Sequence, residues 1–519
     1  MNLKHKKFDI VALFLLIGVF MAALDNGIIS AALTTINQSF EISAQMGSWG
    51  ITIYTLGMAV TTPIAGKLAD MYGRKKIFII EVILFGFGSL LVALSPNYTF
   101  FIIARLIQSF GGGGLFVIAS SHIISTYTKE KQGSMLGGLG AMNGIASVLG
   151  PNIGSLLINV SGTWHWLFLI NVPVAIMIVI FMMIKMPETQ EKVKTKIDKY
   201  AIIVFSFSTL LIMFAINNIQ TGNIANSILS FSVIGLFVLA IIGYGILILV
   251  EYKNEATDID AFLPFYLLKK PAFSVVLIMG VLSGMLIGSI IFIPSFVENV
   301  LHVKAANSGY WMTPLALASG VGASIGGKIV DKKGPIFALV IASIISMVGY
   351  GGLAFLTYST MPFLVFSIIA GLGFGFTIGA PMTVLATKSA HSAKNNSTVI
   401  GTLSVSRQVG ITIAPTIFTT FIQFGYSQMG SKIKDSINSA HFGLKDIPVS
   451  LMNTMEHRSG NLTKILGQVN EISNDTLRHA ITNGIEDATH LAYMPIFLTA
   501  VIAAFIILLL VTLFRKEFK

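Results

Sequence analysis

The chain has 519 residues, of which 54% are hydrophobic and 11% are charged, and its formal net charge is +11 at pH 7. A mean hydropathy of +0.80 is far above that of soluble proteins and indicates a polytopic membrane protein. Lysines retained on the cytoplasmic side of a membrane explain the positive charge, so we expect no nucleic-acid partner. The chain has no cysteine, which excludes disulfides, thiolate nucleophiles and cysteine metal sites.

Apolar runs of about 18 to 26 residues, long enough to cross a hydrocarbon core of about 30 Å, predict an all-α membrane protein with about fourteen transmembrane helices. They lie near residues 9–33, 48–69, 77–95, 99–122, 133–158, 164–186, 199–219, 227–252, 272–298, 307–330, 336–357, 362–387, 398–424 and 490–514. The first run has no cleavage site, so we interpret it as a helix and not as a signal peptide.

Lysine and arginine fall on alternate loops, and the short loops between those loops are almost free of them. The first clusters are Lys4, Lys6 and Lys7; Lys67, Arg74, Lys75 and Lys76; Lys129 and Lys131; and Lys185 to Lys199. Because positive charge stays in the cytoplasm, we predict a multi-pass protein of the bacterial cytoplasmic (cell) membrane with both termini in the cytoplasm.

A charged turn from Gly66 to Lys76 separates two of the apolar runs and predicts a tight cytoplasmic hairpin. Gly66 and Gly73 permit close helix approach or a positive φ, and the Asp70 carboxylate can pair with Arg74 or cap a helix N-terminus.

Residues 327–334 repeat residues 66–73 position by position, with glycine, lysine and aspartate in register. The repeat predicts two six-helix bundles, 1–190 and 261–519, related by an axis along the membrane normal. The linker 191–260 then supplies two extra helices, and transporters place their site between such halves.

The segment 425–489 is polar and lies outside the cell by the same alternation. Its apolar residues recur at helical spacing, which predicts amphipathic helices packed on the external mouth; the alternative is a loose loop without a role. These residues are Leu462, Ile465, Leu466, Val469, Ile472, Leu477, Ala480 and Ile481.

Ionisable residues inside membrane spans are costly and are therefore candidates for function. Asp25 and Arg105 are both expected about 5 to 10 Å from the midplane, on the external side, where the two side chains can meet. Such a pair changes its proton affinity as it opens, which a proton-coupled carrier requires; the alternative is a static ion pair between two helices.

Arg407 lies near the midplane of its run and is a candidate for facing an anionic substrate group or a carboxylate. Glu298, at an external helix end, is a candidate for gathering protons or cations, or an ordinary interfacial carboxylate. Glu81, His122 and Glu251 fall near cytoplasmic helix ends, where snorkelling to the interface is the expected behaviour.

Gly150, Pro151 and Gly154 predict a kinked, closely packed helix that acts as a hinge or as a simple packing face. The glycines 111–114 lie inside an apolar run and do not form a phosphate loop. No Ser-His-Asp or HExxH arrangement is present, so we expect no enzyme activity, no catalytic residue, no metal and no cofactor.

The turn from Gly66 to Lys76 resembles motif A of the major facilitator superfamily, Arg105-Leu106-Ile107-Gln108 with Gly111 resembles its motif B, and Gly150-Pro151-Asn152-Ile153-Gly154 resembles the antiporter motif C. Leu24-Asp25 and the stretch from Trp164 to Pro173 are similar to the fourteen-helix drug:proton antiporter family 2. The resemblance covers nearly the whole chain. Departures are Met71, Ser109, Ser155, His165 and the absence of a proline in Thr34-Thr35-Ile36.

The resemblance implies export of amphipathic, often cationic compounds against proton entry by alternating access. Asp25 would carry protonation or cation recognition, and Arg105 would modulate it. Asp70 and Arg74 would latch the cytoplasmic side, and the kink at Gly150, Pro151 and Gly154 would seal its helix against the opposite bundle.

We therefore expect a monomeric proton-coupled antiporter whose partners are small lipophilic drugs or dyes, protons and the lipid bilayer. One alternative is an exporter of an endogenous lipid, fatty acid or anionic metabolite, with Arg407 binding the head group. A second alternative is a membrane sensor or scaffold that acts through the segment 425–489.

Overall fold

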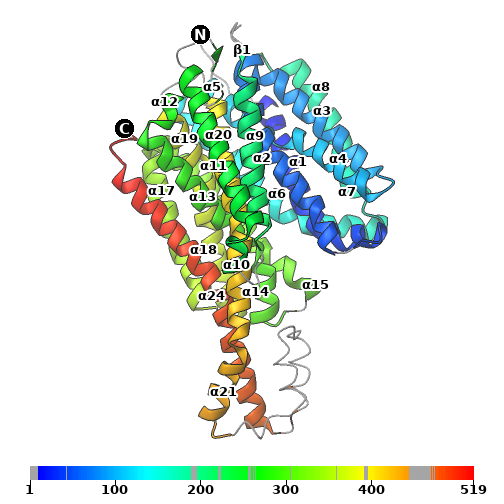
Figure 1. Ribbon diagram of the computed structural model, residues 1–519, viewed down its shortest axis with the longest axis vertical. Coiled ribbons are helices and arrows are strands. Elements are labelled where there is room, and N and C mark those ends of the chain that lie inside the picture. The colour runs from blue at the N-terminus through cyan, green and yellow to red at the C-terminus, as the bar shows by residue number, and fades with distance from the viewer. Residues whose placement is uncertain are drawn as a thin grey trace.

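A computed structural model describes residues 10–518 except 43, 189–195, 220–223, 255–258, 261, 263–264, 304, 358, 391–395, 443–468, 470–471 and 473. Most of this part is α-helical (Figure 1). The lysines of residues 1–9 and 189–195, and the apolar Leu462, Ile465 and Leu466, lie outside the described residues.

The first group of helices packs around two apolar clusters, in which Phe78, Phe85 and Leu115 are fully buried. Its helices are α1 (Ile10–Ser39), α2 (Ala44–Tyr72), α3 (Arg74–Ala93), α4 (Tyr98–Gly112), α5 (Leu115–Thr126), α6 (Lys129–Ser161), α7 (Trp166–Leu169) and α8 (Asn171–Lys185).

The last group packs around a larger cluster that includes Phe273, Tyr350 and Tyr493. Its elements are α13 (Pro271–Ile291), α14 (Ile293–Val300), α15 (Ala305–Ser308), the 3-10 helix η2 (Gly309–Met312), α16 (Thr313–Lys333), α17 (Pro335–Phe355), α18 (Thr360–Ile378), α19 (Ala380–Ala390), α20 (Asn396–Ser427), α21 (Met429–Ser439) and α24 (Asp475–Leu513).

Between these groups, α9 (Lys199–Asn217) and α11 (Phe231–Asn254) pack on each other, with the short α10 (Ile224–Ile228) between them. Two-residue strands β1 (Lys196–Ile197) and β2 (Ile259–Asp260) pair in parallel, and α12 (Phe265–Leu268) follows. The Asp198 carboxylate accepts a hydrogen bond from the Ala201 amide at 2.9 Å and one from the Asn254 side chain. Asp198 thereby joins the start of α9 to the end of α11.

Within the described residues, eleven helical segments are long and apolar enough to cross a membrane, and α6 counted across its bend makes twelve. The protein is therefore a polytopic, helical membrane protein. Helices also form at two further predicted positions, α2 and α16, which do not meet that hydropathy criterion. The exact number of fourteen spans stays a prediction.

Several predicted continuous helices are broken in the structure where glycine or proline weakens the helical hydrogen-bond ladder. The predicted span 99–122 is divided into α4 and α5 at Gly113 and Gly114, and the span 362–387 is divided at Gly379. The span 272–298 is interrupted at Phe292, just before Pro294. Apolar length alone does not locate these breaks.

At one end of the molecule, α21 and the start of α24 form a hairpin that projects beyond the other helices (Figure 1). Ile433 and Ile437 of α21 are fully buried against Ile481 and Ile485 of α24. Val469 and Ile472 join the same cluster, so the predicted amphipathic helical structure is confirmed where this segment is described. The expected packing on the external mouth is not seen for these described residues, because the apolar faces of α21 and α24 cover each other. We call this the α21 end, and the opposite end, where α2 reaches Tyr72, the Asp70 end.

The expectation that Glu81, His122 and Glu251 snorkel to the interface is wrong. Their exposed fractions are 5%, 2% and 0%, so neighbouring helices cover all three side chains. A side chain near a helix end is close enough to reach water, but it does so only where no neighbouring helix covers it.

Candidate functional site

Asp25 of α1 and Arg105 of α4 form an ion pair inside the first helix group. The distance from the Arg105 Nη1 to the Asp25 Oδ2 is 2.6 Å, and both side chains are fully buried. The prediction that these residues meet is confirmed. A charged pair in such a place is stable only when further hydrogen bonds satisfy its remaining atoms.

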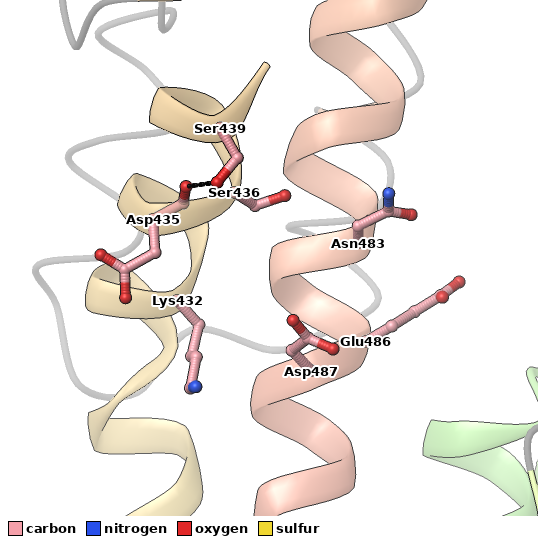
Figure 2. Close-up of a pocket in the computed structure, with 7 residues that line it drawn as sticks. All are labelled: Lys432, Asp435, Ser436, Ser439, Asn483, Glu486 and Asp487. Atoms are coloured by element: carbon pink, nitrogen blue, oxygen red, sulfur yellow. Dashed lines mark hydrogen bonds between the residues drawn. The ribbon is translucent and has the colours of Figure 1, made fainter. Parts of the chain in front are cut away.

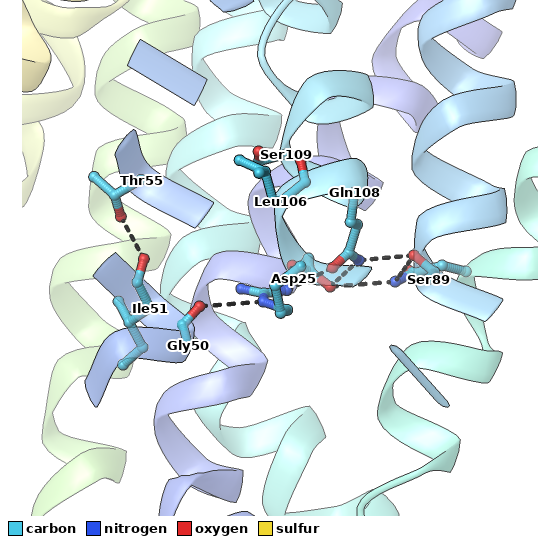
Figure 3. Close-up of polar contacts among 10 residues, drawn as sticks. Asp25, Gly50, Ile51, Thr55, Ser89, Leu106, Gln108 and Ser109 are labelled. Atoms are coloured by element: carbon cyan, nitrogen blue, oxygen red, sulfur yellow. Dashed lines mark hydrogen bonds and ion pairs between the residues drawn. The ribbon is translucent and has the colours of Figure 1, made fainter. Parts of the chain in front are cut away.

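Two side-chain amides supply hydrogen bonds to this pair, and Figure 3 shows the one from Gln108. The Gln108 Nε2 donates to the Asp25 Oδ1 at 2.8 Å and to the Ser89 Oγ at 2.7 Å. The Asn171 Nδ2 lies 3.4 Å from the Asp25 Oδ1 and 3.3 Å from the Ser89 Oγ. Helices α1, α3, α4 and α8 therefore contribute to one buried polar network centred on the Asp25 carboxylate.

The Arg105 guanidinium has three hydrogen bonds and aromatic neighbours. Its Nη1 also donates to the Gln108 Oε1 at 2.6 Å, and its Nε donates to the Gly50 carbonyl at 3.3 Å. The guanidinium lies 4.1 Å from the ring centroid of Tyr54. Its Nη2 is buried and has no hydrogen-bond partner among the described residues, so one donor of the site is not satisfied.

Sequence reasoning singled out Asp25 and Arg105 and assigned no role to Gln108, Ser89, Asn171 or Tyr54. Gln108 follows Arg105 by three residues, so the two share a helix face, and a glutamine inside an apolar run is a signal of function. Nothing in the sequence brings Asn171 of α8 to Asp25 of α1.

The Asp70 carboxylate connects the two helix groups at the Asp70 end. Its Oδ2 accepts hydrogen bonds from the Thr398 backbone amide at 3.1 Å and from the Thr398 hydroxyl at 3.3 Å, near the start of α20. Its Oδ1 lies 3.5 Å from the Arg74 Nη2. Asp70 therefore does both things that the sequence allowed: it pairs with Arg74 and caps a helix N-terminus.

Arg74 extends this contact to α5. Its Nε donates to the Ser121 Oγ at 2.8 Å, and its Nη1 donates to the Ser125 Oγ at 2.9 Å. The Ser397 hydroxyl of α20 in turn donates to the Ser121 Oγ at 2.6 Å. Four helices are thus joined by hydrogen bonds at this end.

Asp331, the residue of the second repeat that corresponds to Asp70, makes the equivalent contact. Its carboxylate accepts hydrogen bonds from the backbone amides of Gly133 and Ser134 at 2.6 and 2.8 Å, and from the Ser134 hydroxyl. Both donors lie near the start of α6, in the other helix group. The Asp70 end is therefore closed by two related contacts.

The motif A glycines have the two uses expected of them. A Cβ on Gly66 would lie 2.6 Å from the Ser397 carbonyl oxygen, so α2 and α20 approach closely there. Gly73 has a φ of +99°, which L-residues rarely adopt.

Helix α6 bends by 45° between Ser147 and Leu149, one turn before Pro151. A proline ring clashes with the carbonyl four residues earlier, which is that of Ser147, so the predicted kink is confirmed and explained. Gly150 faces α1, since a Cβ there would lie 2.5 Å from the Gly27 Cα. Gly154 is buried in the same helix.

Contact between α6 and the other helix group comes from different residues. A Cβ on Gly137 would lie 2.5 Å from the Ala323 carbonyl oxygen of α16, and the Asn152 Nδ2 lies 3.3 Å from the Thr313 Oγ1. Helix α6 therefore meets the other group through these residues, whereas Gly150 packs within its own group, and the seal expected of the kink stays a prediction.

Arg407 of α20 lies apart from the Asp25 network. It is 8% exposed, and its Nε donates to the Ser283 Oγ of α13 at 3.3 Å. Its Nη2 is buried without a hydrogen-bond partner, and no carboxylate pairs with it among the described residues. The expected carboxylate contact is therefore not seen in this conformation.

Glu298 of α14 is exposed at the α21 end. Its charge acts on Tyr426 and Tyr493, and the Tyr493 hydroxyl accepts a hydrogen bond from the Asn299 amide at 3.1 Å. Glu298 is accessible to solvent and separate from the buried network.

Two cavities lie at the α21 end. The first, of about 400 Å³, lies between α21 and α24 and is lined by Lys432, Asp435, Ser436, Ser439, Asn483, Glu486 and Asp487 (Figure 2). The second, of about 300 Å³, shares Glu486 and Asp487 and adds His302 and His490. The first belongs to the hairpin, the second lies between α14, the start of α18 and α24, and neither includes a residue of the Asp25 network.

Comparison with known proteins agrees with this geometry. The sequence model of the Major Facilitator Superfamily matches residues 15–415. The chain is 45% identical to the uncharacterized MFS-type transporter YfiU of Bacillus subtilis, with 96% of each protein covered. It is 31% identical to Multidrug resistance protein 3 of the same organism, with 96% of this chain and 93% of that protein covered.

A solved structure shares the fold. The human organic anion transporter MFSD10 superimposes with a TM-score of 0.58 at 12% identity, covering 79% of this chain and 92% of that one. The match to the family and the identity to its members over nearly the whole length lead to one conclusion: this chain belongs to the Major Facilitator Superfamily and has the fold of its transporters.

Proposed function

We propose that this transporter is a proton-coupled antiporter that exports lipophilic, cationic drugs or dyes from the cytoplasm by alternating access. The observation that carries the proposal is the fully buried Asp25 carboxylate, held by Arg105, Gln108 and Asn171. The name of the relative Multidrug resistance protein 3 supports the substrate class.

A proton and a substrate cation can compete for the Asp25 carboxylate when it leaves Arg105. In the closed pair, Arg105 neutralises the carboxylate at 2.6 Å. When the pair separates, an unpaired carboxylate inside the membrane is costly, so either a proton or a substrate cation takes the place of the guanidinium. Proton and cation then bind in alternation at one carboxylate, which is the requirement for antiport.

The proposal also includes the number of membrane spans, their grouping into bundles and their orientation. Counting α2 and α16 with the twelve other spans gives the fourteen helices of the drug:proton antiporter family 2, with bundles 1–190 and 261–519 and the linker 191–260. The lysine distribution supports a cytoplasmic Asp70 end with both termini there. The contacts of Asp70 and Asp331 close that end, so the conformation described here belongs to the outward-facing side of the cycle. We propose a monomer as the functional unit.

Arg407 favours a second candidate function, the export of an anionic lipid, fatty acid or metabolite. A buried guanidinium with an unpartnered Nη2 and no carboxylate among the described residues is suited to an anionic head group. Substrate charge separates the two candidates.

The deciding experiment is transport in proteoliposomes under an imposed pH gradient, with cationic, neutral and anionic lipophiles. The native protein is compared with Asp25→Asn, and with Glu130→Gln as a control at an exposed carboxylate. We expect gradient-driven movement of cations that Asp25→Asn abolishes and Glu130→Gln retains. Movement of anions alone, or transport indifferent to both the gradient and Asp25, contradicts the proposal.

A further inference from the structure

Glu81 is a second buried carboxyl in the first helix group, and no motif includes it. Its side chain projects from α3, is 5% exposed, and accepts one hydrogen bond, from the Gly114 backbone amide to its Oε2 at 2.9 Å. Gly114 stands at the break between α4 and α5, where helical carbonyl partners for backbone amides are missing. A Cβ on Gly114 would lie 2.8 Å from the Glu81 carboxyl carbon, so the glycine makes room for this contact.

The surroundings of Glu81 differ from those of Asp25 in charge. Asp25 has a guanidinium and two amide donors, whereas Glu81 has one backbone donor and no ion pair within the part of the chain that the structure describes. A carboxylate buried without a cation carries a large desolvation cost, and a carboxylic acid does not. The site is therefore suited to a neutral, proton-bearing Glu81 in this closed conformation.

Tyr54 of α2 contacts both the Asp25 network, through Arg105, and α4 near its end, through Gly112. Its ring covers the Arg105 guanidinium at 4.1 Å, and its buried hydroxyl has no hydrogen-bond partner among the described residues. The hydroxyl would lie 2.6 Å from a Cβ on Gly112, two residues before the glycine that contacts Glu81. Both Asp25 and Glu81 act electrostatically on Tyr54. A hydroxyl that both donates and accepts is suited to passing a proton between them.

Glu81 also lies midway along α3. It is eight residues from Ser89 of the Asp25 network and seven from Arg74 of the Asp70 contact, which corresponds to about 10 to 12 Å in each direction along a helix. A proton that leaves Asp25 toward the Asp70 end therefore passes the level of Glu81.

We propose that Glu81 is a second proton-binding carboxyl of the transport cycle and that Tyr54 connects it to the Asp25–Arg105 pair. The step moves one proton: it leaves the Asp25 carboxylic acid, which regains its ion pair with Arg105, and it neutralises the Glu81 carboxylate. The proposal rests on the proton coupling proposed above and adds a second site to it.

The first test is infrared spectroscopy of the full-length reconstituted protein, comparing the native chain with Glu81→Gln. Glutamine keeps an acceptor for the Gly114 amide, so the fold is expected to persist, and a melting curve checks this. We expect a carbonyl band of a protonated carboxylic acid at neutral pH in the native protein and in the exposed control Glu130→Gln, and its loss in Glu81→Gln. An unchanged band in Glu81→Gln overturns the proposal.

The second test counts protons moved per substrate in proteoliposomes. We expect Glu81→Gln to move one proton fewer than the native protein and Glu81→Asp to restore the count. Tyr54→Phe, which keeps the ring on Arg105, should slow gradient-driven transport by about 100-fold and leave substrate binding unchanged. An equal proton count in Glu81→Gln and the native protein contradicts the role of Glu81. If transport by the native protein does not depend on the gradient, the proposed function fails, and Glu81 then has no part in coupling. The infrared band still decides whether the Glu81 carboxyl holds a proton.

Discussion

Asp70 and Asp331 hold the same position in the two sequence repeats, and each accepts backbone hydrogen bonds near the start of a helix in the other half of the molecule. Asp70 of α2 reaches Thr398 of α20, and Asp331 of α16 reaches Gly133 of α6. In both, a negative charge meets the positive end of a helix macrodipole. The repeated sequence thus produces a repeated contact, and the two halves are joined twice at one end.

We expect Asp70→Asn and Asp331→Asn each to open the Asp70 end. Asparagine keeps one acceptor oxygen and removes the charge, so each change should cost the closed conformation about 1 kcal/mol, or about a fivefold shift in population. Spin labels on cysteines at the exposed positions Lys129 and Lys332 report the distance, and the chain has no other cysteine to be labelled.

The control for this prediction is Asp475→Asn, at an exposed carboxylate on the α21 end that pairs with Arg478 at 2.5 Å. It should leave the distance distribution unchanged. Identical distributions in the native protein, Asp70→Asn and Asp331→Asn would show that these carboxylates do not hold the end closed.

Removing one partner of the Asp25–Arg105 pair should be far more costly than neutralising both. Arg105→Ala leaves a buried carboxylate without its cation, which costs about 3 to 5 kcal/mol. The double variant Asp25→Asn with Arg105→Gln removes both charges and keeps polar groups for Gln108 and Asn171, so it should unfold at a higher temperature than Arg105→Ala. Melting curves in detergent give the comparison. Equal melting temperatures for the two variants would mean that the pair is not charged in the folded protein.

The sequence predicts the charged pair and the motif A contacts well, because both follow from local rules. Helical rise places Asp25 and Arg105 at one depth, and a carboxylate beside a glycine-bounded turn has few partners other than Arg74 and a helix N-terminus. Both predictions use only the distance of a residue along its own helix or from the adjacent turn.

The rest of the site depends on which helix faces meet. Asn171 and Ser89 come to Asp25 from α8 and α3, and no periodicity in the sequence states that these helices are neighbours of α1. The burial of Glu81 was missed for the same reason. Glu81 lies near the end of the predicted span 77–95, but α3 begins earlier, at Arg74, and the Gly114 amide at the break between α4 and α5 donates a hydrogen bond to its buried carboxyl.

A methyl group at Gly66 should separate α2 from α20 although alanine favours a helix. A Cβ there would lie 2.6 Å from the Ser397 carbonyl oxygen, and backbone does not yield as a side-chain tip does. Gly138→Ala of α6 is the matched control, because its nearest neighbour would be the Leu16 Cδ2 at 3.8 Å. We expect faster maleimide labelling of a cysteine at the buried Ser397 in Gly66→Ala and unchanged labelling in Gly138→Ala. Equal labelling in both variants would mean that the interface absorbs the extra methyl group.

Displacing α21 from α24 tests whether the hairpin is required for transport. A Cβ on Gly484 would lie 2.5 Å from the Ile433 Cα, whereas one on Gly430 of the same hairpin meets nothing within 4 Å. Gly484→Leu should therefore displace α21 from its apolar cluster, at a cost of about 1 to 3 kcal/mol, and Gly430→Leu should not. Protease sensitivity of the hairpin reports the displacement. Transport in proteoliposomes then separates two functions. An exporter whose coupling lies in the Asp25 network keeps gradient-driven transport in Gly484→Leu. A sensor or scaffold that acts through the hairpin loses its activity when α21 is displaced.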